Sequence, residues 1–237
     1  MIVYGRNAVK EALRGRRAGT VGEILVAPAL AREPWLGSRP VVISSPEEIE
    51  RACGSREHQG VCAELAGYPY VSTQELLMGE APLIVALDEI QDPQNLGAIA
   101  RTAECVGATG VVICERRAAE ITPAVCRASA GAVEHLRIAR ARNLADFLLA
   151  ARGAGCWCYG TVAAAGATAY TEPDYSGGVV IVLGGEGRGL RRRVAESCDA
   201  LVTLPLRGRI ASLNVNAAAG AVLYEVLHRR GGLDRTP

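Results

Sequence analysis

The second half of the chain repeats one pattern, in which short continuous runs of Val, Ile and Leu alternate with helix-like segments. The clearest apolar runs are LIVALD at 83–88, VVIC at 111–114 and VVIVLG at 179–184. Strands that are apolar throughout must be covered on both faces, which favours a parallel sheet with helices above and below it. The sequence therefore predicts an α/β domain in this region.

Glycine, proline and helix-capping residues indicate where the predicted helices and strands begin and end. In the second half we expect helices at 95–108, 122–131, 143–155, 189–196 and 212–230, and further strands at 135–139, 156–160 and 200–206. In the first half we expect helices at 5–15 and 45–54, strands at 23–27, 40–44 and 60–66, and a short helix at 73–78. These elements predict a small α/β domain at 1–68, a linker at 69–82 and a larger parallel-sheet domain at 83–237.

Composition narrows the class of protein. Hydrophobic residues make up 49% and charged residues 22% of the 237 residues, which is typical of a folded, water-soluble chain. No apolar run reaches the ~18 to 20 residues of a membrane span, and the amphipathic start lacks a signal-peptide core. We therefore expect a cytoplasmic protein with no membrane partner. The net charge of +1 does not decide for or against a nucleic-acid partner.

The eight cysteines and three histidines do not form a metal-binding pattern. The cysteines are scattered and mostly lie inside apolar runs, where a free thiol behaves as a small hydrophobic group. Cys156 and Cys158 have no second pair at the spacing that a structural zinc site needs. We expect free thiols and no metal.

Three segments depart from the plain α/β pattern, and each follows a predicted strand. The first begins with Asp92-Pro93, which predicts a turn, and we expect Asn95 to cap the next helix. Arg101 lies in this helix among the apolar residues 98–100, where a charge without a partner is costly.

The second segment is the glycine-rich VLGGEGRGL at 182–190. Its glycines at 184, 185, 187 and 189 allow the backbone to approach a ligand closely. It lacks the Lys-Ser/Thr of a nucleotide-triphosphate loop, and it has neither the glycine spacing nor the position of a dinucleotide fingerprint. Glu186 within it is placed to hold an arginine or accept a ligand proton.

The third segment, LPLRGRIASLNVNAAAG at 204–220, joins a strand to the last helix. The simplest interpretation of Ser212 is a helix N-cap. Asn214 and Asn216 are less usual, because asparagine is unfavourable inside helices. The small residues 217–220 permit close helix packing, although burial in the core explains them equally well.

Together these segments resemble the SPOUT superfamily of methyltransferases, specifically its SpoU/TrmH branch of RNA ribose 2′-O-methyltransferases. The family pattern Asn-x-Gly-x-x-x-Arg is met by Asn95, Gly97 and Arg101. The glycine pattern is met by Gly184, Glu186, Gly187, Gly189 and Leu190. The third pattern is met by Leu204, Pro205, Ser212, Leu213, Asn214 and Val215, whereas Leu206 replaces the usual methionine and Asn216 the usual serine.

The resemblance implies a deep trefoil knot in the second domain, S-adenosylmethionine as the cofactor, and a homodimer formed by helices beside the knot. It implies that the cofactor contacts Gly184, Gly187, Leu204, Leu213 and Asn216. It implies that catalysis involves Arg101, Asn95, Glu186, Ser212 and Asn214. A guanidinium accepts a proton only after losing one, so Arg101 is either unusually desolvated or stays charged, binding phosphate and stabilising the forming alkoxide.

The first domain resembles the small substrate-binding domain of 23S ribosomal RNA guanosine 2′-O-methyltransferases, through GRNAVKEAL at 5–13 and HQGVCAEL at 58–65. Its arginines are expected to contact the RNA backbone: Arg6, Arg14, Arg16 and Arg17. The expected phosphate contacts of the second domain are Arg188, Arg191, Arg192, Arg193, Arg207 and Arg209.

Several functions remain as alternatives. A transfer-RNA guanosine 2′-O-methyltransferase is the first of them, and an inactive RNA-binding protein of the same fold is the second. The intact set of Asn95, Arg101, Glu186 and Asn214 argues against the inactive protein, and Asn216 is the only hint in its favour. A nicotinamide-dependent oxidoreductase is excluded, because no fingerprint loop opens the first β-α-β unit.

Overall fold

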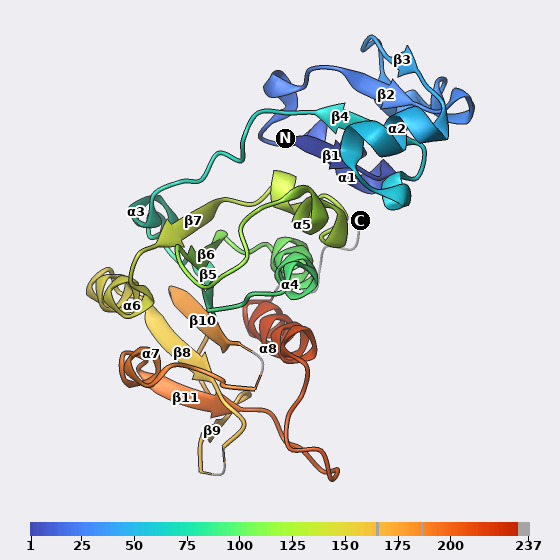
Figure 1. Cartoon of the computed structure of the whole chain (residues 1–237). Coiled ribbons are helices and arrows are strands. Elements are labelled where there is room, and N and C mark those ends of the chain that lie inside the picture. Colours follow the sequence, from blue (N-terminus) through green and yellow to red (C-terminus); the bar gives the residue numbers. More distant parts are fainter. Residues whose placement is uncertain (165, 186, 232–237) are drawn as a thin grey trace.

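The computed structural model describes residues 1–164, 166–185 and 187–231, and these residues form two sheets (Figure 1). The smaller sheet contains β1 (Ile2–Tyr4), β2 (Ile24–Val26), β3 (Val42–Ile43) and β4 (Val61–Glu64). Its strand order is β1-β4-β2-β3, with antiparallel pairs except between β2 and β3. The strand β1, at the very start of the chain, was not predicted.

The small domain contains two α-helices, of which the second has a side-chain cap. They are α1 (Arg6–Ala12) and α2 (Pro46–Cys53). Helix α2 begins with a capping box between Ser45 and Glu48 and ends at Gly54, which has a φ of 69°. Short 3-10 helices lie at Ala18–Thr20, Pro28–Leu30, Pro34–Leu36, Arg56–His58 and Ala132–Glu134.

The larger sheet has seven strands, and all of its pairs are parallel, which confirms the predicted fold class. The strands are β5 (Leu83–Asp88), β6 (Gly110–Cys114), β7 (Ile138–Ala141), β8 (Trp157–Thr161), β9 (Thr168–Ala169), β10 (Val179–Gly184) and β11 (Ala200–Thr203). They are ordered β7-β6-β5-β10-β8-β11-β9. β7 begins later than expected, and β9 was not predicted.

Helices cover both faces of this sheet (Figure 1). They are α3 (Thr73–Leu76), α4 (Pro93–Cys105), α5 (Pro123–Ala128), α6 (Leu144–Gly153), α7 (Arg192–Glu196) and α8 (Val215–Arg229). Alternate strand residues face opposite sides. Val85 and Ile181 belong to the hydrophobic cluster that contains residues of α4 and α8, whereas Ile84 and Val180 belong to the cluster of α6.

Two helix starts differ from the sequence predictions. Asp92, not Asn95, is the N-cap of α4, because Pro93 fits the first helical position and leaves Asp92 to accept from the Gln94 N–H. Asn214, not Ser212, is the N-cap of α8, and its Oδ1 accepts from the backbone N–H of Asn216 at 2.9 Å. The cap of α4 therefore lies before the predicted residue, and the cap of α8 lies after it.

The two sheets share a continuous hydrophobic cluster, and an ion pair crosses the interface between them. Arg17 and Glu134 have side chains only 1% and 0% exposed, and Arg17 Nε donates to Glu134 Oε2 at 2.8 Å. Tyr68 donates its hydroxyl to the carbonyl oxygens of Val133 and Leu136. Arg17 is therefore a buried interdomain residue, and its predicted contact with RNA is wrong.

All eight cysteines are free thiols, as expected. Across residues 1–164, 166–185 and 187–231, no helix is both long and apolar enough to cross a membrane.

Candidate functional site: two adjoining cavities

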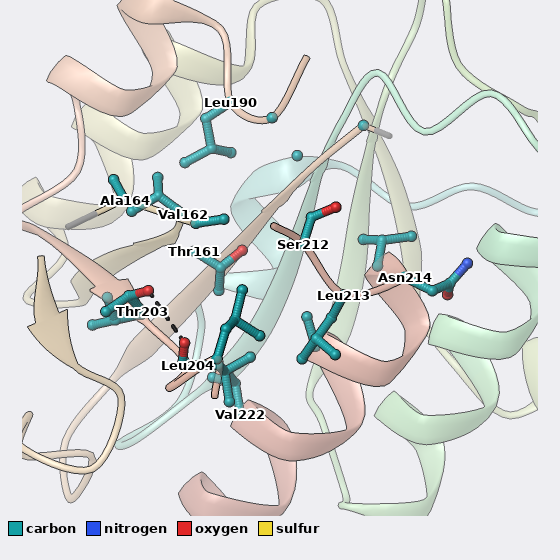
Figure 2. A pocket seen from close by; sticks show the side chains of 18 of the residues that line it. Thr161, Val162, Ala164, Leu190, Thr203, Leu204, Ser212, Leu213, Asn214 and Val222 are labelled. Atoms are coloured by element: carbon teal, nitrogen blue, oxygen red, sulfur yellow. Dashed lines mark hydrogen bonds between the residues drawn. The ribbon is translucent and has the colours of Figure 1, made fainter. Parts of the chain in front are cut away.

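A cavity of about 640 Å³ opens where β8, β10 and β11 end. Its walls come from residues 161–164 after β8, from 184, 185 and 187–190 after β10, and from the segment between β11 and α8 (Figure 2). Because these neighbouring strands are parallel, their carboxyl ends meet at one edge of the sheet. This edge is where open α/β sheets bind ligands.

The glycine segment, the glycine-rich stretch that follows β10, forms one wall of this cavity with exposed backbone. The Gly189 N–H donates to the Gly185 carbonyl oxygen at 3.0 Å, which folds the segment back on itself. A Cβ atom at Gly184 would overlap the backbone of Gly189, and Gly187 has a φ of 77°. The segment therefore needs glycine at these positions. Glu186 lies outside the described residues.

The rest of the first cavity combines apolar walls with a few polar groups, as small-molecule sites usually do. Leu204, Leu213 and Val222 supply apolar surface, and Ser212 and Asn214 supply polar groups (Figure 2). Among the described lining residues the charged one is Arg188. The cavity can thus hold a mainly apolar molecule that carries polar groups.

A second cavity, of about 500 Å³, adjoins the first at the carboxyl end of β5. The two cavities share Gly185, Arg188 and Gly189. In contrast to the first, the second is lined mostly by charged and amide side chains, among them Asn95 at the start of α4. Two ligands could therefore meet across the glycine segment.

An ion pair fastens the end of the glycine segment to β5. Asp88 is fully buried at its side chain, and it accepts from the backbone N–H of Arg191 at 2.8 Å and from Arg191 Nε at 2.7 Å. Burial acts against the charged guanidinium, but the hydrogen bond and charge of Asp88 outweigh it and raise the pKa of Arg191. Arg191 is committed to this contact, so its predicted role as a phosphate ligand is not supported.

Asparagines of the first and third segments meet between α4 and α8. Asn216 Nδ2 donates to Asn95 Oδ1 at 2.6 Å, and Asn95 is only 6% exposed. Asn216 Oδ1 is buried and has no hydrogen-bond partner among the described residues. Asn216 is not among the residues that line the first cavity, where the resemblance placed it as a cofactor contact.

Arg101 lies apart from both cavities. Its side chain is exposed on α4, and it lines neither space. The expectation of an arginine surrounded by apolar residues is therefore wrong for the single chain, because residues 99 and 100 point into the core while position 101 faces solvent.

The structure thus brings most of the predicted site residues to one edge of the sheet. The first cavity is lined by Gly184, Gly187, Leu204, Ser212, Leu213 and Asn214. Asn95 lines the second, and Asn216 contacts Asn95. Sequence reasoning missed Asp88, although a carboxylate ending an otherwise apolar strand was a signal that could have found it.

In the described part of the chain, no group of three or more His, Cys, Asp or Glu side chains is placed to hold a metal ion.

Comparisons with known proteins agree with this architecture. Residues 82–224 match the model of the SpoU rRNA Methylase family, and residues 2–71 match the model described as RNA 2′-O ribose methyltransferase substrate binding. A Bacillus subtilis protein, YacO, named as a TrmH family tRNA/rRNA methyltransferase, is 43% identical over 242 residues, which cover 96% of this chain and 95% of that protein.

Solved structures give the same result. An rRNA methyltransferase from Sinorhizobium meliloti, crystallised with bound AdoMet, is 29% identical with a TM-score of 0.80, covering 96% of this chain and 86% of that one. The SpoU methyltransferase AviRb from Streptomyces viridochromogenes is 25% identical with a TM-score of 0.81, covering 97% and 89%.

Fold and cavities together define a two-domain α/β protein with a small-molecule site at the edge of a parallel sheet. The family model and the 43% identical relative identify it further: the chain belongs to the SpoU family and is an RNA methyltransferase. S-adenosylmethionine is the methyl donor that this family uses.

Proposed function

We propose that this protein transfers a methyl group to the ribose 2′-hydroxyl of a guanosine in 23S ribosomal RNA, in the cytoplasm. The observation that carries the proposal is the pair of adjoining cavities, one mainly apolar and one polar, which share the backbone of Gly185 and Gly189. A methyl donor and a nucleotide held on either side of this wall would be in position to react.

The first cavity suits S-adenosylmethionine. Backbone at Gly184 and Gly187 can approach a ligand without side-chain obstruction, and Leu204 and Leu213 offer apolar surface for a base. The bound cofactor would supply an electrophilic methyl group on a sulfonium. These residues would hold and orient it, and Arg188 would attract its carboxylate.

The other predicted residues would act on the nucleotide. A ribose hydroxyl is a weak acid, so the site must orient it and stabilise the negative charge that develops on its oxygen. We assign this role to Asn95, Ser212, Asn214, Glu186 and a charged Arg101. The bond between Asn216 and Asn95 would hold the Asn95 amide in one orientation.

Arg101 would complete the site across a homodimer. Arg101 is carried by α4, which packs against α8. The exposed face of α8 presents Ala217 and Tyr224, and a Cβ at Gly220 would meet no atom within 4 Å. Pairing two copies through this small-residue face would bury it and bring Arg101 of each copy towards the other's cavities.

RNA selection would fall to the first domain. Ribose hydroxyls are chemically alike along an RNA, so shape and single-stranded bases must distinguish the target. We retain 1–68 as the RNA-binding domain, 69–82 as a linker and 83–237 as the catalytic domain. The exposed Arg14 and Arg16 remain candidates for backbone contacts.

We also propose the deep trefoil knot. β11 lies beyond β8 in the sheet, whereas α8 returns to pack against α4 on the other side of β10. The segment from 204 to 214 must therefore cross back over the strand ends, as a knotted connection requires.

The test is methyl transfer from tritiated S-adenosylmethionine to unmodified 23S ribosomal RNA and to transfer-RNA transcripts, followed by nucleoside analysis. We expect 2′-O-methylguanosine from the ribosomal RNA. The same product from transfer RNA alone would establish the alternative substrate, and base-methylated products or none would disprove ribose methylation.

Mixing two inactive variants tests the dimeric site. Arg101→Ala should lose turnover but still bind S-adenosylmethionine in calorimetry, and so should Asn214→Ala. Co-expression of the two should restore roughly a quarter of the wild-type turnover, since half the dimers would be mixed and carry one intact site each. No recovery would show that Arg101 does not act across the dimer.

A further inference from the structure

The second cavity has two strained residues in its wall. Four non-glycine residues of the described chain have positive φ, namely Gln59, Glu89, Arg117 and Ala130. Glu89 and Arg117, at 56° and 57°, both line this cavity. This conformation brings the Cβ atom of a non-glycine residue close to the backbone at a cost of about 1–2 kcal/mol, and residues that adopt it cluster at ligand sites.

The two strained residues belong to loops that are tied together. Glu89 follows β5 and Arg117 follows β6, and the Ala119 N–H donates to the Ile90 carbonyl oxygen at 2.8 Å. The loops thereby hold Glu89 Oε1 3.9 Å from the Arg117 guanidinium. An acidic and a basic side chain therefore lie at the same cavity.

Two arginines lie near the Glu89 carboxylate. Its side chain is 15% exposed, and Arg191 NH1 lies 3.2 Å from Oε1, the oxygen that Arg117 also faces. Arg191 is itself fixed by Asp88. Both contacts of Glu89 with these arginines are made through Oε1.

A carboxylate such as that of Glu89 can distinguish RNA bases by the hydrogen bonds it accepts. A carboxylate only accepts hydrogen bonds. The Watson–Crick edge of guanine presents two adjacent donors, N1–H and N2–H₂, whereas the edges of adenine, cytosine and uracil each pair a donor with an acceptor. A base turned out of an RNA loop is read on this edge. The exposed Arg117 can meet an adjoining phosphate.

We propose that the second cavity binds the base of the target guanosine and that Glu89 is the residue that selects guanine, by accepting from its N1–H and N2–H₂ groups. The proposal rests on the ribose methylation proposed above and names the base-binding part of that site. Arg117, 76% exposed and only loosely paired, would turn to the phosphate when the base enters.

The first arm of the test is Glu89→Gln, with Glu196→Gln as a matched control that also removes a glutamate from an arginine pair. We expect Glu89→Gln to lower kcat/KM for guanosine methylation about 10- to 100-fold, because an amide nitrogen would face the donors of the base. Calorimetry should show unchanged S-adenosylmethionine binding for both variants. Wild-type kcat/KM in Glu89→Gln would overturn the proposal.

The second arm leaves the protein intact. Once nucleoside analysis has located the methylated position, an RNA fragment carrying it is synthesised with guanosine or with inosine, which lacks the N2 amine. Wild-type protein should methylate the inosine fragment about 10-fold less efficiently, and Glu89→Gln should lose this discrimination. Equal rates on both fragments with wild-type protein would overturn the proposal, even if Glu89→Gln does not fold.

The two proposals fail in different ways. Ribose methylation of a nucleoside other than guanosine would overturn the role of Glu89 and leave the methyl transfer standing. The absence of any ribose methylation by wild-type protein would overturn the proposed function itself.

Discussion

Two arginine–carboxylate pairs of similar chemistry serve different regions of the molecule. Arg17 and Glu134 meet at the domain interface and are almost fully buried on both sides. Asp88 and Arg191 meet at the wall of the second cavity, where the carboxylate is buried but the arginine side chain is 45% exposed. The first pair is sealed, and the second faces a space that a ligand can enter.

The difference in exposure indicates a difference in role. A sealed pair cannot touch a ligand and acts only on the relative placement of the domains. The acceptors around Arg17 are all internal. They are both Glu134 oxygens, the Ala66 carbonyl oxygen and the sulfur atoms of Met1 and Cys126. The cavity pair instead holds a segment that two ligand spaces share, so its loss should alter binding more than stability.

The largest effect on stability should come from breaking the sealed pair. Glu134→Gln leaves the Arg17 guanidinium buried without its counter-charge, which costs about 3–5 kcal/mol. Denaturant unfolding followed by circular dichroism measures this loss. Replacing both residues, with Arg17→Met and Glu134→Leu, should recover most of it, because an apolar pair needs no desolvation of charge. A loss below about 1 kcal/mol in Glu134→Gln would show that water reaches this interface.

Breaking the cavity pair should weaken cofactor binding. Arg191→Gln frees the end of the glycine segment from Asp88, and we expect S-adenosylmethionine to bind about 10-fold more weakly in calorimetry. Arg191→Lys should restore only part of the affinity, since a lysine cannot match the two-point geometry. Unchanged cofactor binding together with a large loss of unfolding free energy would make this pair structural, like the first.

Neither pair could be predicted from the sequence, because each joins residues more than a hundred positions apart. What could be predicted was set locally. Continuous apolar runs determined β5, β6 and β10, and the proline, serine and glycine signals determined α2. Arg17 illustrates the limit, since a basic residue in a basic stretch gives no sign of a buried partner in another domain.

The candidate site likewise has a part that local sequence predicted and a part that it did not. The glycine segment and Ser212–Asn214 were found because their residue types are unusual at strand and helix ends, and the structure places them around one cavity. The second cavity was missed. Glu89 and Arg117 look ordinary in sequence, and only their backbone conformation and the pairing of two loops bring them together.

The sealed interface should also respond to alkaline pH. Cys126 lies beside the Arg17–Glu134 pair, and burial, followed by the charge of Glu134, raises the pKa of its thiol to about 12, from 9.0. The neutral Cys126 thiol therefore favours the folded state. This contribution to the free energy of unfolding is fully present below pH 9 and is lost as the pH rises towards 12.

Over this range Cys126 alone should lower the unfolding free energy by up to about 1.4 kcal/mol per pH unit. Denaturant unfolding at several pH values checks this, and Cys126→Ala should flatten the slope. Ser129→Ala on the same buried face is the control, because it removes a hydroxyl without removing a titrating group. An identical slope in Cys126→Ala would place the alkaline sensitivity elsewhere.

The smallest effect should come from a pair of equal length on the surface. Arg192 Nε lies 2.8 Å from Glu196 Oε1, as close as the bonds of the buried pairs, but the two side chains are 91% and 59% exposed. Glu196→Gln should cost only about 0.3–0.5 kcal/mol in denaturant unfolding, and less at high salt. If it cost as much as Glu134→Gln, distance rather than burial would set the strength of these pairs, and the contrast between the sealed interface and the open cavity would lose its physical basis.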